Sequence, residues 1–264
     1  MIEKAVWNME PIPIHQTYTA LNNGGIILCA YDHDQMIGYS YSFAGFNNNQ
    51  SYLCSHMLGI LPDYRQKGLG ERLKLKQAEI ARKMGYSKIT WTYDPLESRN
   101  AYVNLHKLRA IGAHYKENHY GQLNDNLNQG LPTDRIVIEW PLQKKQKEFI
   151  NQKNSENDYS SSNKDRQLIM VTLEQPRISK NFNRNLIEEN SWFVPIPNHF
   201  QKIKKQNIEL AKKWRFTIRQ VFLKLFSDGF IATDFIFNKQ SNYSLYVFTK
   251  DFRRKQNELI DSRN

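Results

Sequence analysis

The stretch LGILPDYRQKGLGERLKLKQAEIARKMG, from Leu58 to Gly85, decides the fold. An apolar run stops at Pro62, a basic segment with two glycines follows, and a charged amphipathic helix begins near Leu69. The first amides of a helix have no intrahelical partner and lie at the positive end of its dipole, so they favour an anion. Glycines there let the backbone approach the anion without an intervening Cβ. The stretch therefore predicts a strand, a phosphate-binding turn and a helix that Gly85 ends.

The flanking sequence alternates strand and helix patterns, which predicts a mixed α/β fold. Before residue 143 we expect a hairpin at 24–43, strands at 52–61, 87–94 and 132–142, and a helix capped by Ser98. Beyond residue 167 we expect strands at 167–173 and 191–197, one long helix from about 200 to 226, and a closing hairpin at 230–248. That long helix should bury one apolar face, made of Trp214, Ile218, Val221, Phe222 and Leu225.

A change of composition divides the chain. Residues 143–167 are polar and rich in serine and asparagine, as a linker is. The predicted organisation is a domain at 1–142, this linker, and a C-terminal β-α-ββ extension at 168–264.

The bulk properties exclude several classes of protein. No apolar run approaches the roughly 18 residues of a membrane helix, and the N-terminus lacks the pattern of a secretion signal, so a cytoplasmic protein without membrane contact is expected. Cys29 and Cys54 form no CxxC pair and are expected to be buried thiols, and the scattered histidines predict no metal site. The net charge of +11 is compatible with nucleic acid, an anionic surface or a phosphorylated small molecule, or with a lysine-rich surface alone.

The glycine turn fits neither of two common nucleotide motifs. A Walker loop needs GxxxxGK followed by Ser or Thr, and a dinucleotide fingerprint needs a glycine where Leu73 stands. The pattern that remains, R-x-x-G-x-G from Arg65 to Gly70, resembles the pyrophosphate-binding motif of the GNAT acyltransferases. The segments TWTYDPL, an asparagine-containing helix and PTDR resemble a bacterial branch of that superfamily. The resemblance covers about residues 24–140 well and 192–248 moderately, and implies a central mixed sheet flanked by helices, with a C-terminal α/β extension.

By this resemblance the chain binds acetyl-CoA or another acyl-CoA as co-substrate. Leu58 and Ile60 would offer backbone groups to the pantetheine arm, and Arg65 and Lys67 would supply positive charge. The pyrophosphate would lie on the amides of Gln66, Lys67, Gly68, Leu69 and Gly70. Asn100 and Asn104 would hydrogen-bond the cofactor, unless they are helix-surface residues. The alternative for the whole turn is a simple connection between strand and helix.

Acyl transfer to an amine needs a base for the amine and an acid for the departing thiolate. His56, on the strand before the turn, is the predicted base; the alternative is a hydrogen-bonded core histidine. The tyrosine that many GNAT enzymes use as the acid is replaced here by Leu105, so Tyr102, one turn earlier, is the predicted substitute, against a role in the core. Asp94 and Glu97 are predicted to hold the amine acceptor or to stiffen a turn.

Two further features bear on this hypothesis. Asp134 and Arg135 are expected to form a structural ion pair. Only about 23 residues precede Gly24, where GNAT domains place a strand and one or two helices, so the N-terminal region is expected to be shortened.

The sequence thus predicts a GNAT-type N-acyltransferase acting on an unidentified amine by direct transfer. One rival is a non-catalytic acyl-CoA-binding or sensor protein, which the missing tyrosine favours. Another is a nucleic-acid-binding protein, which only the charge suggests, and no nucleic-acid partner is expected. The sequence leaves a homodimer open.

Overall fold

The computed structural model describes residues 2–47, 49–65, 67–123, 125, 128–142, 165–172 and 174–251. The chain divides into two compact units. Unit 1 comprises Met1–Thr92, Leu123–Gln129 and Ile138–Phe149, and unit 2 comprises Tyr93–Gln122, Gly130–Val137 and Ile150–Asn264. This division differs from the predicted domains, because the segment from Tyr93 to Gln122 groups with the C-terminal part of the chain.

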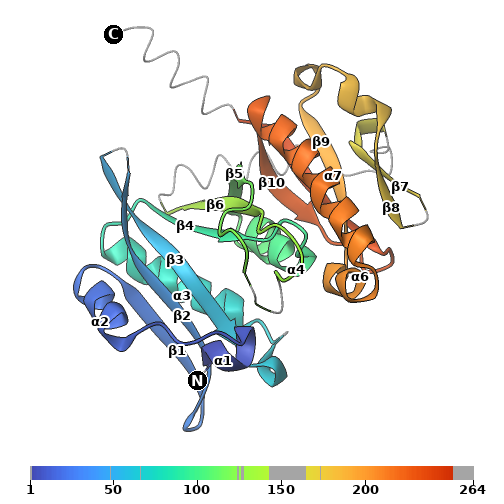
Figure 1. The fold of residues 1–264 in the computed structure, drawn as a ribbon. Helices are drawn as coiled ribbons and strands as arrows, with labels where there is room; N and C mark the ends of the chain where they lie inside the picture. Colours follow the sequence, from blue (N-terminus) through green and yellow to red (C-terminus); the bar gives the residue numbers. More distant parts are fainter. Residues whose placement is uncertain are drawn as a thin grey trace, which may run out of the picture. The chain divides into compact units, whose positions relative to one another are not determined.

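Unit 1 is a sheet with helices on it, in the strand order β1-β2-β3-β4 (Figure 1). Its helices and strands are α1 (Ile2–Trp7), α2 (Ile14–Asn22), β1 (Ile26–Asp32), β2 (Gln35–Asn47), β3 (Gln50–Ile60), η1 (Pro62–Tyr64), α3 (Leu69–Lys83) and β4 (Lys88–Tyr93, through Thr92). Strands β1, β2 and β3 are antiparallel neighbours, and β4 is parallel to β3. Helix α3 packs against β1, β2 and β3, so the strand–turn–helix reading of residues 58–85 is confirmed.

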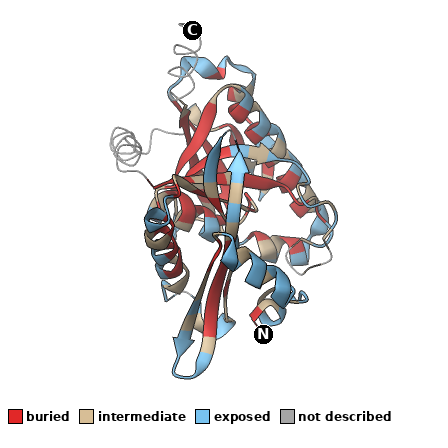
Figure 2. Ribbon diagram, turned by 90° about the vertical axis from the view of Figure 1, so that its left-hand side faces the viewer, coloured by how far each residue is buried: buried red, intermediate tan, exposed pale blue. Residues whose placement is uncertain are grey.

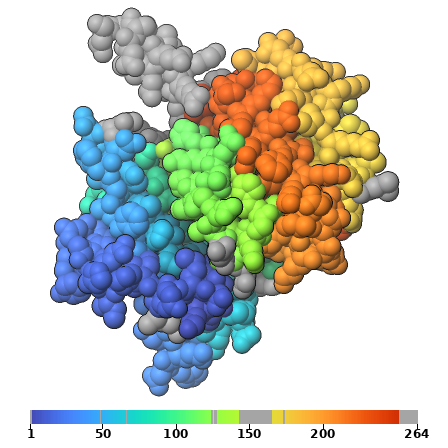
Figure 3. Space-filling model, in the orientation of Figure 1, coloured from blue at the N-terminus to red at the C-terminus, as the bar shows by residue number. Residues whose placement is uncertain are grey.

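The N-terminal residues of unit 1 are helical. Helices α1 and α2 lie at the surface, in dark blue in Figure 3, and α2 has no buried residue. In the described part of the chain, two short helices therefore precede β1, its first strand.

Unit 2 contains a second run of neighbouring strands, in the order β5-β10-β11-β9, and the separate hairpin β7-β8. Its strands are β5 (Ile111–Lys116), β7 (Ile169–Thr172), β8 (Gln175–Ile178), β9 (Ser191–Pro197), β10 (Phe230–Ile236) and β11 (Tyr243–Lys250). Its helical segments are α4 (Ser98–Ala101), the π-helical η2 (Tyr102–Lys107), η4 (Lys180–Asn183), η5 (Leu186–Glu188), α6 (Phe200–Gln206) and α7 (Ile208–Ser227). Strand β6 (Arg135–Pro141) gives its first residues to unit 2 and its last to unit 1.

Helix α7 organises the core of unit 2. It packs against β5, β8 and β10, and its five predicted core residues, from Trp214 to Leu225, are all fully buried. Figure 2 shows the same distribution more widely: buried residues concentrate on the strands, and the helices expose their outer faces. The predicted mixed α/β fold class is confirmed.

Several local predictions need correction. The long helix breaks at Asn207, whose side chain accepts a hydrogen bond of 2.9 Å from the Leu210 amide and so caps α7. Ser98 is not a cap, because its hydroxyl donates to the Asn198 carbonyl instead. Strands β5 and β8 were not predicted. Both cysteines were expected to be buried, but Cys29 is exposed and Cys54 is half-buried. Most of the predicted linker, residues 143–164, lies outside the described residues.

Candidate functional site

The turn between β3 and α3 has the backbone geometry of an anion-binding site. Gly68 is the N-cap of α3 with φ 75° and ψ 4°, a left-handed conformation that side-chain-bearing residues adopt at a cost. Among the described residues no side chain caps the helix, so they leave its first amides available. A Cβ at Gly68 would meet no atom within 4 Å, and one at Gly70 would lie 3.6 Å from Leu58 Cδ2. The backbone of this turn is therefore open to a ligand.

The basic residues of the turn are exposed. Arg65 donates through Nε to the Ile60 carbonyl at 3.1 Å, which fixes its side chain to the end of β3. Lys67 Nζ lies 5.1 Å from the centre of the Tyr64 ring. Leu69 begins α3, and Gln66 lies outside the described residues. Asp63 and Glu71, close to the same turn, partly offset its positive charge.

Strand β3 carries an irregularity next to this turn. Tyr41 pairs with Met57 and Ser42 with Ser55, so His56 is an extra residue in β3, a β-bulge. On the other edge, β3 pairs with β4 only at Leu53–Ile89 and Cys54–Thr90 in the described chain. From Ser55 to Ile60, including Leu58, the edge of β3 that faces β4 pairs with no described strand of unit 1. We call this separation of β3 from β4 the strand split.

His56 is exposed, so the alternative of a core histidine is wrong. Its ring lies 6.2 Å from the Tyr41 ring and 5.7 Å from the Phe43 ring, centre to centre. Partial removal of water by these neighbours lowers the pKa of His56 below its usual 6.5. The imidazole has no hydrogen bond to any described residue, so its nitrogens are accessible to a substrate.

Lys74 is a residue of this region that the sequence analysis missed. Its side chain is 4% exposed, and Nζ donates to Ser55 Oγ at 2.8 Å and lies 3.6 Å from the centre of the Trp91 ring. Burial lowers its pKa from 10.5 to about 7, against a smaller opposing effect of the Cys54 thiol. The sequence spacing could have predicted its burial, because Lys74 lies four residues after Gly70 and four before Ala78, which is buried on the inner face of α3.

The remaining predicted residues belong to unit 2. Asn100 is exposed and Asn104 is buried. The Tyr102 ring stacks on His106, with centres 4.9 Å apart, and contacts Phe237. The cofactor roles of Asn100 and Asn104 and the acid role of Tyr102 stay predictions.

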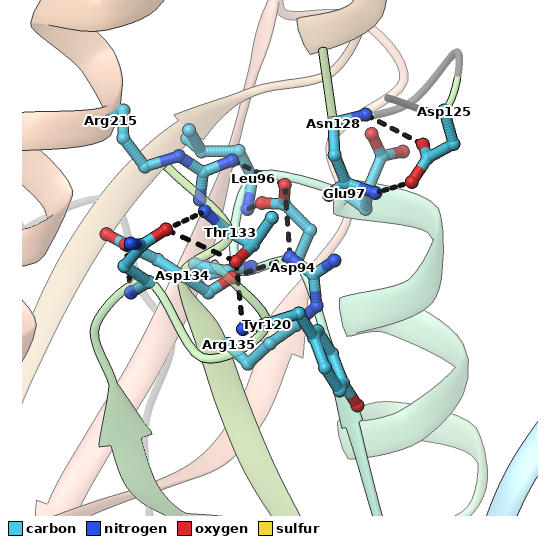
Figure 4. Close-up of polar contacts among 12 residues, drawn as sticks. Asp94, Leu96, Glu97, Tyr120, Asp125, Asn128, Thr133, Asp134, Arg135 and Arg215 are labelled. Carbon is cyan, nitrogen blue, oxygen red and sulfur yellow. Dashed lines mark hydrogen bonds and ion pairs between the residues drawn. The ribbon is translucent and has the colours of Figure 1, made fainter. Parts of the chain in front are cut away.

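Asp94 is engaged in the interior of unit 2, as the close-up in Figure 4 shows. Its carboxylate accepts hydrogen bonds from the Leu96 amide at 2.9 Å and from Arg215, and Arg135 lies 3.9 Å away. The side chains of Asp94 and Arg215 are 12% and 2% exposed. This geometry favours the structural alternative for Asp94, with Arg215 as its counter-ion.

The predicted ion pair between Asp134 and Arg135 is wrong, because the partner of Asp134 is Arg219. The Asp134 carboxylate binds Arg219 at 2.6 Å and 2.9 Å and accepts from Tyr115. Arg135 donates to the Asp134 backbone carbonyl instead. Burial alone would raise the pKa of Asp134, but the hydrogen bonds from Arg219 and Tyr115 hold it below its usual range.

Glu97 borders a cavity of unit 2. The cavity has a volume of about 450 Å³ and is lined by residues 96–99 and 198–202. Glu97 Oε1 accepts a hydrogen bond of 2.6 Å from Gln201, and burial, together with the nearby Asp94, raises the pKa of Glu97 above 4.5. Its carboxylate is the acidic group of this lining, which also contains the basic side chains of Arg99 and Lys202.

Two kinds of feature are absent from the described residues. They contain no cluster of three or more side chains suited to a metal ion. No helix in the described ranges is long and apolar enough to cross a membrane.

Residues 2–108 match the model of the acetyltransferase (GNAT) family, a span of less than half of the chain. No curated protein matches the chain. The matched span contains the bulge, the strand split and the glycine turn. The GNAT resemblance is therefore confirmed for this segment of the chain.

Several solved structures are similar to part of the chain. Arabidopsis thaliana Naa50, in complex with a bisubstrate analogue, is 16% identical over 52% of this chain and 86% of that chain, with a TM-score of 0.41. The Escherichia coli ribosomal-protein-S18-alanine N-acetyltransferase is 15% identical over 54% and 84%, with a TM-score of 0.41. A GNAT family acetyltransferase from Elizabethkingia anophelis with acetyl-CoA bound is 15% identical over 50% and 92%, with a TM-score of 0.40. Similarity at this level does not indicate a substrate for this chain.

Proposed function

We propose that this protein is an acyl-CoA-dependent N-acyltransferase, with acetyl-CoA as its first candidate donor and an amine as acceptor. The observation that carries the proposal is the overlap of the family match, over residues 2–108, with a glycine turn whose amides are uncapped. The cytoplasmic location, the bacterial branch and the lack of a nucleic-acid partner stay predictions from the sequence.

The residues of unit 1 fit the co-substrate. The left-handed Gly68 and the free space around it admit a pyrophosphate to the first amides of α3, with Arg65 and Lys67 close by. The unpaired edge of β3, from Ser55 to Ile60, offers backbone groups to the amides of a pantetheine arm. When bound, acyl-CoA would supply the activated acyl group.

The chain's own residues supply the acid–base chemistry. His56 would take the proton of the attacking amine, because its ring is accessible and its lowered pKa keeps it neutral at physiological pH. A backbone N–H near the bulge would donate to the carbonyl oxygen as negative charge develops there. The acceptor-binding role of Glu97, which borders a cavity within unit 2, stays a prediction from the sequence.

A matched pair of glycine variants tests the binding step. Gly68 and Gly85, at opposite ends of α3, have φ of 75° and 87°, and a Cβ at either meets no atom within 4 Å. Gly68→Ala and Gly85→Ala should therefore each lose about 1–2 kcal/mol of stability from backbone strain. We expect only Gly68→Ala to weaken binding of acetyl-CoA and CoA, measured by isothermal titration calorimetry.

The outcomes separate the candidate functions. Absence of acetyl-CoA binding by the unmodified protein, or equal weakening by both variants, would contradict the glycine-turn site. Binding without release of CoA in the presence of any amine would favour the alternative, a non-catalytic acyl-CoA-binding protein of GNAT fold.

A further inference from the structure

Lys74 occupies the closed end of the strand split. The last paired residues are Cys54 on β3 and Thr90 on β4, and the residues directly after them are Ser55 and Trp91. Lys74 Nζ contacts both, at 2.8 Å from Ser55 Oγ and 3.6 Å from the centre of the Trp91 ring. One amino group from α3 therefore lies where the two strands separate.

No negatively charged side chain compensates the ammonium form of Lys74 in the part of the chain that the structure describes. No carboxylate forms an ion pair with Lys74 in the part of the chain that the structure describes, and Ser55 is its one hydrogen-bond acceptor there. An ammonium has three N–H donors, so others remain for a ligand. The Cys54 thiol is the titratable group that acts on Lys74 from the neighbouring strands. A buried, uncompensated cation favours a partner on which negative charge develops.

The proposed binding mode brings such a partner to this place. The pyrophosphate end of the co-substrate would lie at Gly68, beyond the end of β3, so its thioester would lie back along the strand. From Ile60 to Ser55 the strand extends about 16 Å at ~3.3 Å per residue. The thioester would thus approach Lys74 and the neighbouring bulge at His56.

We propose, on the basis of the proposed acyltransferase function, that Lys74 is the acid of the reaction, which protonates the departing sulfur of CoA. The nitrogen of the acceptor forms a bond to the acyl carbon, and the carbon–sulfur bond breaks with its electron pair remaining on sulfur. One proton passes from the acceptor amine to His56, and one passes from Lys74 Nζ to the sulfur. Free CoA thiol and an amide result, and exchange with solvent restores Lys74 and His56.

The assignment explains two observations together. The family's usual tyrosine position holds Leu105, which cannot donate a proton. A group with a pKa of about 7 can hold a proton at neutral pH and release it to a thiolate, whose parent thiol has an ordinary pKa of about 8.5.

Two variants test the role of Lys74. Lys74→Met removes the amine at similar length, and Lys74→Gln keeps a donor for Ser55 without an acidic proton. Lys76→Met is the control, because Lys76 is an exposed lysine of the same helix, paired with Glu79. The assay is release of CoA from acetyl-CoA with hydroxylamine as the amine, and isothermal titration calorimetry measures the affinity for acetyl-CoA in parallel.

We expect both Lys74 variants to release CoA at least 100-fold more slowly in single turnover, with the Kd for acetyl-CoA changed less than threefold. Lys76→Met should match the unmodified protein. In the unmodified protein the rate should also fall as pH rises above 7, and this fall should be absent in Lys74→Gln.

Each contrary outcome is decisive. Unchanged turnover in the Lys74 variants, beside normal binding and catalysis by the unmodified protein, would overturn the role of Lys74 alone. Loss of acetyl-CoA affinity at unchanged turnover would make Lys74 a binding residue. Absence of binding or of CoA release by the unmodified protein would overturn the proposed function, and this inference with it. Should Lys74→Met fail to fold, Lys74→Gln decides.

Discussion

Replacing Lys74 by methionine should stabilise the protein, and by an amount that depends on pH. The side chain is 4% exposed, so the folded chain holds an amine in an apolar environment that disfavours its charged form. Methionine has a similar length, keeps a contact with Trp91 and carries no charge. It leaves the Ser55 hydroxyl without its donor, which costs about 1 kcal/mol at any pH.

The magnitude follows from the pKa of Lys74. Folding lowers this pKa from 10.5 to about 7, so the folded chain binds fewer protons than the unfolded chain between these values. Stability therefore rises with pH across this window, and the penalty is fully present below pH 7 and absent above 10.5. The full penalty is roughly 5 kcal/mol, at about 1.4 kcal/mol per factor of ten. Between pH 7 and 8.5 it should shrink by about 1.5 kcal/mol.

The assay is urea unfolding of both proteins at pH 7 and at pH 8.5, followed by tryptophan fluorescence. Contributions of other titrating groups, such as Cys54, largely cancel in the difference between the two proteins. The stability advantage of Lys74→Met should narrow by about 1.5 kcal/mol as the pH rises. An advantage that stays constant would show that Lys74 is not charged and buried as described, and would refute the reasoning.

Three further variants probe the other candidate residues. His56→Gln should reduce turnover about 100-fold and leave the affinity for acetyl-CoA unchanged. In the unmodified protein the acid limb of the pH–rate profile should lie below pH 6.5, because the pKa of His56 is lowered. An unchanged rate in His56→Gln would exclude His56 as the base. Glu97→Gln should raise KM for a cationic acceptor in steady-state kinetics and leave acetyl-CoA binding intact. In the unmodified protein this KM should rise as pH falls through the raised pKa of Glu97. The same KM in the variant and the unmodified protein would show that Glu97 does not bind the acceptor. Arg215→Met removes the nearer of the two cations beside Asp94 and leaves Arg135, 3.9 Å away. It should lower the free energy of unfolding, measured in urea, by about 3 kcal/mol. A change within about 1 kcal/mol would mean that Asp94 and Arg215 are not a buried pair.

The sequence predicts well those parts of the fold whose signals are local. The hairpin at 24–43, the strand before Pro62 and helix α3 each follow from periodicity and turn residues within a short window. The glycine turn belongs to this class, because a left-handed N-cap favours glycine whatever the rest of the chain does. The break at Asn207 was missed although its signal is also local, because asparagine is a preferred N-cap.

The missed features depend on pairing between distant residues. His56 was identified by its position on a strand, but its status as the bulge residue arises from the register of β3 on β2. The partner of Asp94 is Arg215, 121 residues further along the chain, so proximity in the sequence instead suggested a free carboxylate. The same effect misassigned Asp134, whose partner is Arg219 rather than the adjacent Arg135.

Lys74 shows why stability and chemistry must be measured on the same variant. Lys74 and Gln77 interrupt the apolar inner face of α3, and an apolar side chain at position 74 would fold at lower cost. If Lys74→Met is both more stable and slower, the lysine lowers stability and is needed for turnover, which is the trade-off expected of an active-site residue. If it is more stable and equally fast, the buried amine has no role in the reaction, and Tyr102, the acid that the sequence predicts, is the next residue to replace.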